Sequence, residues 1–93
     1  MGRGVKTIVQ TSQFKQDLKR VKHSGRYEID DLLEIVDLLA QNQPLLEKHK
    51  DHNLTGNWRG HKECHIKPDW LLVYQLTPDK VVLTRTGSHS ELF

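Results

Sequence analysis

The sequence predicts an α+β domain in which a helical hairpin packs on one face of a small, mainly antiparallel sheet. Apolar residues recur with a helical period in the first half of the chain and with a strand-like pattern in the second half. Two matching tetrapeptides, KPDW and TPDK, separate three strand-like segments as tight turns do. The predicted element order is therefore β-α-α-β-β-β, with residues 1–93 as a single domain.

The first predicted strand and helix lie within residues 5–24. The segment VKTIVQ, residues 5–10, is rich in branched side chains and is typical of a strand. Ser12 is then expected to cap the N-terminus of a helix, which Ser24-Gly25 ends. The apolar stripe of this helix has helical spacing: Phe14, Leu18 and Val21.

A second helix is predicted from about Tyr27 to Ala40, ending before Pro44. Its acidic residues gather in the early turns, where the helix dipole favours negative charge. Its apolar residues form a wide stripe, which predicts substantial burial: Ile29, Leu32, Leu33, Ile35, Val36, Leu39 and Ala40.

Three strands are predicted after a polar, glycine-containing connection over residues 45–60. In the first of them Cys64 and Ile66 share the core face, while Glu63 and His65 share the other face. The segment WLLVYQL is apolar almost throughout, as a central strand is, and KVVLTRT forms the last strand. The sheet face opposite the helices is expected to be partly open.

Composition restricts the class of protein. The net charge is +2 and the chain has one cysteine, Cys64, so an internal disulfide is excluded and a reducing compartment is expected. No stretch approaches the ~20 apolar residues of a membrane span, and no secretion signal is apparent, so we expect no membrane partner. Met1 to Gly4 are expected to be a loose leader.

A group of polar residues is expected to converge at one end of the open sheet face. His65 lies on that face, Asp69 follows the first turn, and His52 precedes the strand. Arg85 and His89 come from the last strand and its exit. Such a set suits phosphodiester cleavage without a metal, because one group can deprotonate a ribose 2′-OH, another can protonate the leaving 5′-oxygen, and arginine can stabilise the charge. The alternative is a set of surface polar residues on a half-solvated sheet.

A metal site is the weaker interpretation of the histidines. His61 and His65 have the i, i+4 spacing of a helical zinc site. On a strand, four residues span ~13 Å, which is too far for two ligands of one zinc ion. We therefore expect no metal and no other cofactor.

The stretches KDHNLTGNWRGHKECHIKPDWLLVYQL and LTRTGSHSELF resemble the YafQ-type branch of the RelE superfamily. That resemblance implies a RelE-like fold and a bacterial toxin of a type II toxin–antitoxin module, acting in the cytoplasm. It implies a ribosome-dependent endoribonuclease (mRNA interferase) that cleaves mRNA in the ribosomal A site, with 2′-OH attack leaving a 2′,3′-cyclic phosphate or a 3′-phosphate. The implied partners are an acidic cognate antitoxin, the 70S ribosome and mRNA.

The resemblance also implies roles for individual residues. His89 is implied to be the general acid, Arg85 to bind the scissile phosphate, and Phe93 to stack on a base or wedge beside it. The other three site residues share the roles of abstracting the proton and positioning the substrate, and the resemblance does not say which residue has which role: His52, His65 and Asp69. His61 receives no role.

Two other functions compete with the nuclease. A non-catalytic toxin like the ParE branch, which binds gyrase, shares the fold without this histidine set. A plain RNA-binding domain would need a basic sheet with exposed aromatics, which the strand faces lack. Because the candidate site holds few cations of its own, ribosome binding is assigned to the basic face of the first helix and its end: Lys15, Lys19, Lys22 and Arg26.

Overall fold

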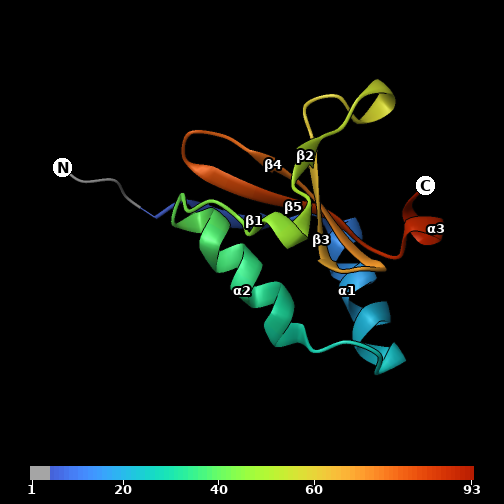
Figure 1. Ribbon diagram of the computed structural model, residues 1–93. Helices are drawn as coiled ribbons and strands as arrows, with labels where there is room; N and C mark the ends of the chain where they lie inside the picture. The colour runs from blue at the N-terminus through green and yellow to red at the C-terminus, as the bar shows by residue number, and fades with distance from the viewer. Residues whose placement is uncertain (1–4) are drawn as a thin grey trace.

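A computed structural model describes residues 5–93, so the leader expected at residues 1–4 lies outside the described part. The α+β class and the helical hairpin on one sheet face are confirmed (Figure 1). The elements run in this order: β1 (Thr7–Gln10), α1 (Ser12–Ser24), α2 (Ile29–Ala40), the 3₁₀ turn η1 (Glu47–His49), β2 (His52–Asn53), the 3₁₀ turn η2 (Gly56–Trp58), β3 (Lys62–Lys67), β4 (Trp70–Leu76), β5 (Lys80–Gly87) and α3 (His89–Leu92).

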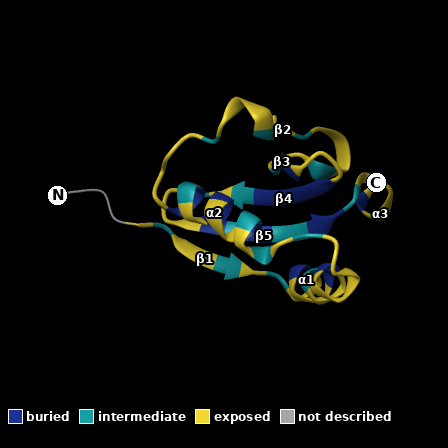
Figure 2. Cartoon of the chain, turned by 60° about the horizontal axis from the view of Figure 1, so that its bottom comes forward, coloured by how far each residue is buried: buried dark blue, intermediate teal, exposed yellow. Residues whose placement is uncertain are grey.

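The five strands form one sheet in the order β1-β5-β4-β3-β2. β1 pairs with β5 in parallel, whereas every other pair is antiparallel, so the mainly antiparallel sheet is confirmed. The Pro-Asp turns lie between β3 and β4 and between β4 and β5, as predicted. β4 is the central strand and is buried from Trp70 to Tyr74 (Figure 2).

The two sheet faces carry separate apolar clusters. The larger one lies between the sheet and the hairpin of α1 and α2, and Trp70 stacks on Tyr27 there with ring centroids 4.8 Å apart. The smaller one lies on the opposite face, where Leu71 and Val73 of β4 pack with Leu92 of α3. Leu54 and Trp58 pack against this cluster, so the predicted open face is partly covered by α3 and the residues around η2.

The structure corrects three local predictions. The N-cap of α1 is Thr11 rather than Ser12, because the Thr11 hydroxyl accepts from the Phe14 amide at 2.9 Å and also donates to the Thr84 carbonyl. α2 begins at Ile29, and Leu33 is 55% exposed rather than part of the buried stripe. The break at Gly25 is confirmed, since its φ of 68° is left-handed.

β2 and α3 were not predicted. β2 has two residues, too few to produce a periodic pattern. α3 has a capping box in which Ser88 caps the Glu91 amide and Glu91 caps the Ser88 amide, a spacing visible in the sequence. None of the helices between residues 5 and 93 is long and apolar enough to cross a membrane.

Candidate active site

The strand register aligns the candidate residues in two rows across one face of the sheet. One row crosses four strands: His52, Glu63, Val73 and Arg85. The next row lies two residues along the strands: His65, Leu71 and Gly87. Directly opposed residues, and residues two apart on a strand, point to the same face. The structure therefore places His52, His65 and Arg85 on the face that carries the smaller apolar cluster, with His52 and Arg85 roughly 14 Å apart along the sheet.

Backbone carbonyls hold the imidazole rings of this face. His52 Nδ1 lies 2.7 Å from the Lys50 carbonyl, and His65 Nδ1 lies 3.3 Å from the Pro68 carbonyl. A carbonyl oxygen only accepts, so Nδ1 carries the proton in each bond. When the His65 ring is neutral, its Nε2 therefore has a free lone pair and can accept a proton.

His52 has a second partner that the sequence did not reveal. Its Nε2 lies 3.3 Å from Oε1 of Glu63, whose side chain is 8% exposed. A His52 ring protonated on both nitrogens donates to the Lys50 carbonyl and to the Glu63 carboxylate at once. The sequence placed Glu63 on the strand face opposite the core but gave it no role. Its position on the same face as His65 was the feature that could have pointed to the site.

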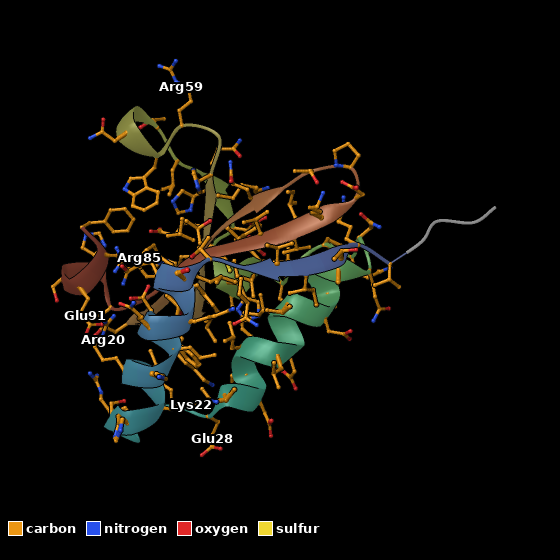
Figure 3. All side chains as sticks on the ribbon, turned by 180° about the vertical axis from the view of Figure 1, so that it is seen from behind. Arg20, Lys22, Glu28, Arg59, Arg85 and Glu91 are labelled. Atoms are coloured by element: carbon orange, nitrogen blue, oxygen red, sulfur yellow. The ribbon has the colours of Figure 1, made fainter. Side chains whose placement is uncertain are left out.

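Arg85 is held by a buried carboxylate on α1. Arg85 Nε and Nη2 donate to the two oxygens of Asp17 at 2.7 and 3.1 Å, and the Asp17 side chain is 0% exposed. The Arg85 side chain stays 24% exposed, and this fork uses only one side of the guanidinium group. Arg20 also contacts Asp17 at 3.3 Å and Glu91 at 3.2 Å, and Figure 3 shows Arg20 and Glu91 pointing toward each other near Arg85.

The end of β1 explains why a carboxylate is buried here. β1 pairs with β5 only as far as Leu83, after which the chain turns into α1. The Thr86 amide beyond that point has no strand partner on this side and donates to Asp17 at 3.1 Å. Asp17 lies three residues after Phe14 and four before Val21, so its position within the apolar stripe was the sequence signal for a buried acid.

The pKa of Asp17 reflects these contacts. Burial alone raises the pKa of this carboxyl, but hydrogen bonds from Arg85, the Thr86 amide and Gln13 outweigh burial and bring the pKa below its ordinary value. The same bond to Asp17 raises the pKa of the Arg85 guanidinium. Both groups are therefore charged over the whole physiological range of pH.

Aromatic rings from the C-terminal residues and from the region around η2 form a continuous row. The ring centroids of His89 and Phe93 lie 5.3 Å apart, and those of Phe93 and Trp58 lie 5.9 Å apart. His61 continues the series at 5.3 Å from Trp58. Leu92 is buried between His89 and Phe93 in sequence, which ties the terminus to the sheet, while Phe93 remains 48% exposed.

Asp69 makes its polar contacts on the helical side of the β3–β4 turn. Its carboxylate is 3.9 Å from Arg26 Nη2, and the Tyr27 hydroxyl donates to its carbonyl at 3.3 Å. Its polar contacts thus join it to the connection between α1 and α2. The structure does not connect Asp69 with His65 through a direct polar contact.

The predicted ribosome-binding residues lie on exposed surface. Lys15, Lys19 and Lys22 are exposed along α1, and Figure 3 labels Lys22 there. Arg26 follows the helix, with its guanidinium carbon 5.2 Å from the centroid of the Tyr27 ring. These cations are on a different element from the two rows of the sheet.

The described residues offer no obvious metal centre. Between residues 5 and 93, no three His, Cys, Asp or Glu side chains are grouped so that they could hold an ion. Burial raises the pKa of the Cys64 thiol to about 12, so this side chain is a neutral core group rather than a thiolate ligand.

Comparisons with known proteins agree on one family. A family model described as "Bacterial toxin of type II toxin-antitoxin system, YafQ" matches residues 6–93. The mRNA interferase toxin YafQ of Escherichia coli (strain K12) is 36% identical over 87 residues, covering 92% of this chain and 94% of that protein. A solved structure of a copper-bound mutant toxin from Helicobacter pylori has a TM-score of 0.89 and 38% identity, covering 96% of this chain and 99% of that one. The E. coli DinJ-YafQ complex matches with a TM-score of 0.84 and 35% identity, covering 95% and 98%.

Proposed function

This chain belongs to the YafQ family of toxins from bacterial type II toxin–antitoxin systems, and from that premise we propose that it is an mRNA interferase. The resemblance to this branch of the RelE superfamily, predicted from the sequence, is confirmed. The proposed activity is ribosome-dependent cleavage of mRNA in the A site, in the bacterial cytoplasm, by acid–base catalysis that needs no metal.

The observation that carries the proposal is the anchoring of two imidazole rings on the sheet face that also carries Arg85. His65 is the proposed base, because its Nδ1 is occupied by the Pro68 carbonyl and its Nε2 is free to take the proton of a ribose 2′-OH. The 2′-oxygen then bonds to phosphorus as the bond from phosphorus to the 5′-oxygen breaks. Arg85, held by Asp17, stabilises the charge on the phosphoryl oxygens.

The other residues complete the proposed reaction. His89 protonates the leaving 5′-oxygen, which gives a 2′,3′-cyclic phosphate and a 5′-hydroxyl. His52, whose two ring nitrogens lie against the Lys50 carbonyl and the Glu63 carboxylate, is given a positioning role rather than that of the base. Phe93 supplies a half-exposed ring for stacking on a base. Asp69 is given a positioning role: its carbonyl accepts from Tyr27 and its carboxylate pairs with Arg26, and these contacts hold the β3–β4 turn.

Two partners follow from the family. The YafQ toxin of E. coli has been solved with DinJ, and we expect this chain to be neutralised by an acidic antitoxin of its own. The lysines of α1 are proposed to contact ribosomal RNA and to hold the toxin while the A site presents the codon.

The deciding experiment compares programmed ribosomes with free mRNA. We expect codon-positioned cuts on ribosomes, little cleavage of free mRNA, and products that end in a 2′,3′-cyclic phosphate or 3′-phosphate. The reaction should persist when catalytic divalent ions are removed, provided that enough ions remain to keep ribosomes intact. Products with a 5′-phosphate would contradict the proposal, because they indicate attack by an activated water.

A further inference from the structure

A basic pocket lies beside His65 at the open edge of the sheet. β2 pairs with β3 only at Lys62 and Glu63, so the rest of that edge has no strand partner. The 3₁₀ turn η1 lies beside β3 there (Figure 1). His49 of η1 donates from Nδ1 to the His65 carbonyl at 2.8 Å, which fixes the turn against the strand.

Between η1 and the β3–β4 turn is a pocket of about 360 Å³, which we call the η1 pocket. Lys48, His49 and Lys50 line it from the side of η1, and His65 and Lys67 line it from the sheet. Its volume is within the range of pockets that take small ligands. His65 is therefore shared between the pocket and the candidate active site.

The pocket is positively charged. Three lysines line it, and no acidic residue does. Asp31 of α2 approaches from outside and pairs with Lys67 at 3.3 Å, which offsets one charge. Two lysine charges remain, next to a region where the sequence predicted few cations. The prediction missed them because Lys48 and Lys50 fall in a connection whose path along the edge of β3 has no periodic signal.

We propose that the η1 pocket binds an RNA phosphodiester that flanks the cleaved bond. This inference rests on the proposed function. An RNA chain whose 2′-OH contacts His65, the proposed general base, must pass its neighbouring nucleotides over the surface around that residue. The η1 pocket is part of that surface, because His65 also lines it, and it is basic. Lys48 and Lys50 are the phosphate ligands, with Lys67 released from Asp31 as a third.

The test uses Lys48→Gln and Lys67→Gln, singly and together, with Lys80→Gln as the matched control. Lys80 has 51% side-chain exposure and one carboxylate partner, Asp79 at 3.7 Å; Lys67 has 48% exposure and Asp31. Lys80 lies at the far end of β5 from the two rows. Cleavage on programmed ribosomes is followed in single turnover against toxin concentration.

We expect the double variant to raise the half-saturating toxin concentration about tenfold and to lower the slope of log affinity against log salt by about 1. The maximal rate and the melting temperature should stay close to those of wild type, and Lys80→Gln should behave as wild type. A double variant indistinguishable from Lys80→Gln in both half-saturation and salt slope would overturn the proposal.

Two further measurements distinguish the source of the phosphate. If it belongs to mRNA, an uncharged methylphosphonate linkage next to the cleaved bond should weaken the wild type more than it weakens the double variant, which retains only Lys50 of the three lysines. If it belongs to ribosomal RNA, the double variant should lose affinity equally for ribosomes without mRNA. The affinity of each variant for programmed ribosomes and its salt dependence are also measured by direct binding, so an inactive wild type would refute the proposed function while the lysine comparison still decides the pocket.

Discussion

Asp17→Asn is the substitution for which the structure gives the clearest quantitative expectation. The carboxylate is completely buried and accepts hydrogen bonds from Arg85, the Thr86 amide and Gln13. An asparagine of nearly the same size keeps one acceptor oxygen. Its amide group then faces hydrogen-bond donors, and the negative charge opposite Arg85 is lost.

The expected loss of stability follows from these contacts. Removing one partner of a buried ion pair costs about 3–5 kcal/mol because the other charge is left unpaired. Arg85 is 24% exposed, so its guanidinium can recover water, and part of the cost is relieved. We expect the free energy of unfolding to fall by about 2–3 kcal/mol, which lowers Tm by roughly 10–20 °C in a chain of this size.

The assay is denaturant and thermal unfolding at pH 7, together with single-turnover cleavage per folded molecule. Asp37→Asn is the matched control, because Asp37 is an exposed helical aspartate that accepts from Gln41 just as Asp17 accepts from Gln13. Cleavage should also slow about tenfold or more, since Arg85 loses its fixed position. A Tm within a few degrees of wild type, with unchanged cleavage, would refute the reasoning about both the buried pair and Arg85.

The same pair predicts how stability depends on pH. The pKa of Asp17 is lowered in the folded state, so its contribution is fully present above the ordinary aspartate pKa of about 3.9. That contribution is lost as the pH falls through the lowered pKa. The difference in unfolding free energy between wild type and Asp17→Asn should therefore be constant from pH 7 to about pH 5 and shrink below about pH 4. A difference that grows on acidification would contradict this sign.

Three further changes test the chemistry and the docking. His89→Ala should slow single-turnover cleavage about 10²–10⁴-fold with little change in Tm, and a near wild-type rate would remove this residue from the mechanism. Deleting Phe93, whose half-exposed ring contacts His89, should reduce cleavage more than stability; a large drop in Tm with cleavage per folded molecule unchanged would mean that the ring only packs. Replacing Lys15, Lys19 and Lys22 together by Glu should abolish ribosome binding and leave Tm unchanged, which binding to purified ribosomes can check.

The elements that the sequence predicted are those with strong periodicity. The strands on either side of the two Pro-Asp turns carry enough alternating or continuous apolar residues to fix their type and, through the turns, their antiparallel order. β2 could not be found in this way, because His52 and Asn53 are two polar residues whose strand state depends only on pairing with β3. Leu33 was misassigned because a wide apolar stripe does not show where the edge of the buried face lies.

For the candidate site, the sequence predicted which residues share a face but not the partners that hold them. Spacing within and between strands brought His65 and Arg85 to one face, because register follows from short turns. The partners of these residues were missed: Asp17 is 68 positions from Arg85 in the chain, and Glu63 meets His52 only through β2. Contacts of this kind depend on how separate elements pack, which no local pattern encodes.

Backbone carbonyls bind one nitrogen of the His52 ring and one nitrogen of the His65 ring, and both rings stay outside the buried core. The carbonyls belong to Lys50 and Pro68, both at bends in the chain where a carbonyl need not bond to a neighbouring strand. Using them fixes the protonated nitrogen of His52 and His65 without burying either ring. Arg85 is positioned differently, by the buried Asp17, whose carboxylate also replaces a missing strand for the Thr86 amide. The same carboxylate thus closes the sheet edge and orients the cation, which is why one substitution at position 17 should move both stability and rate.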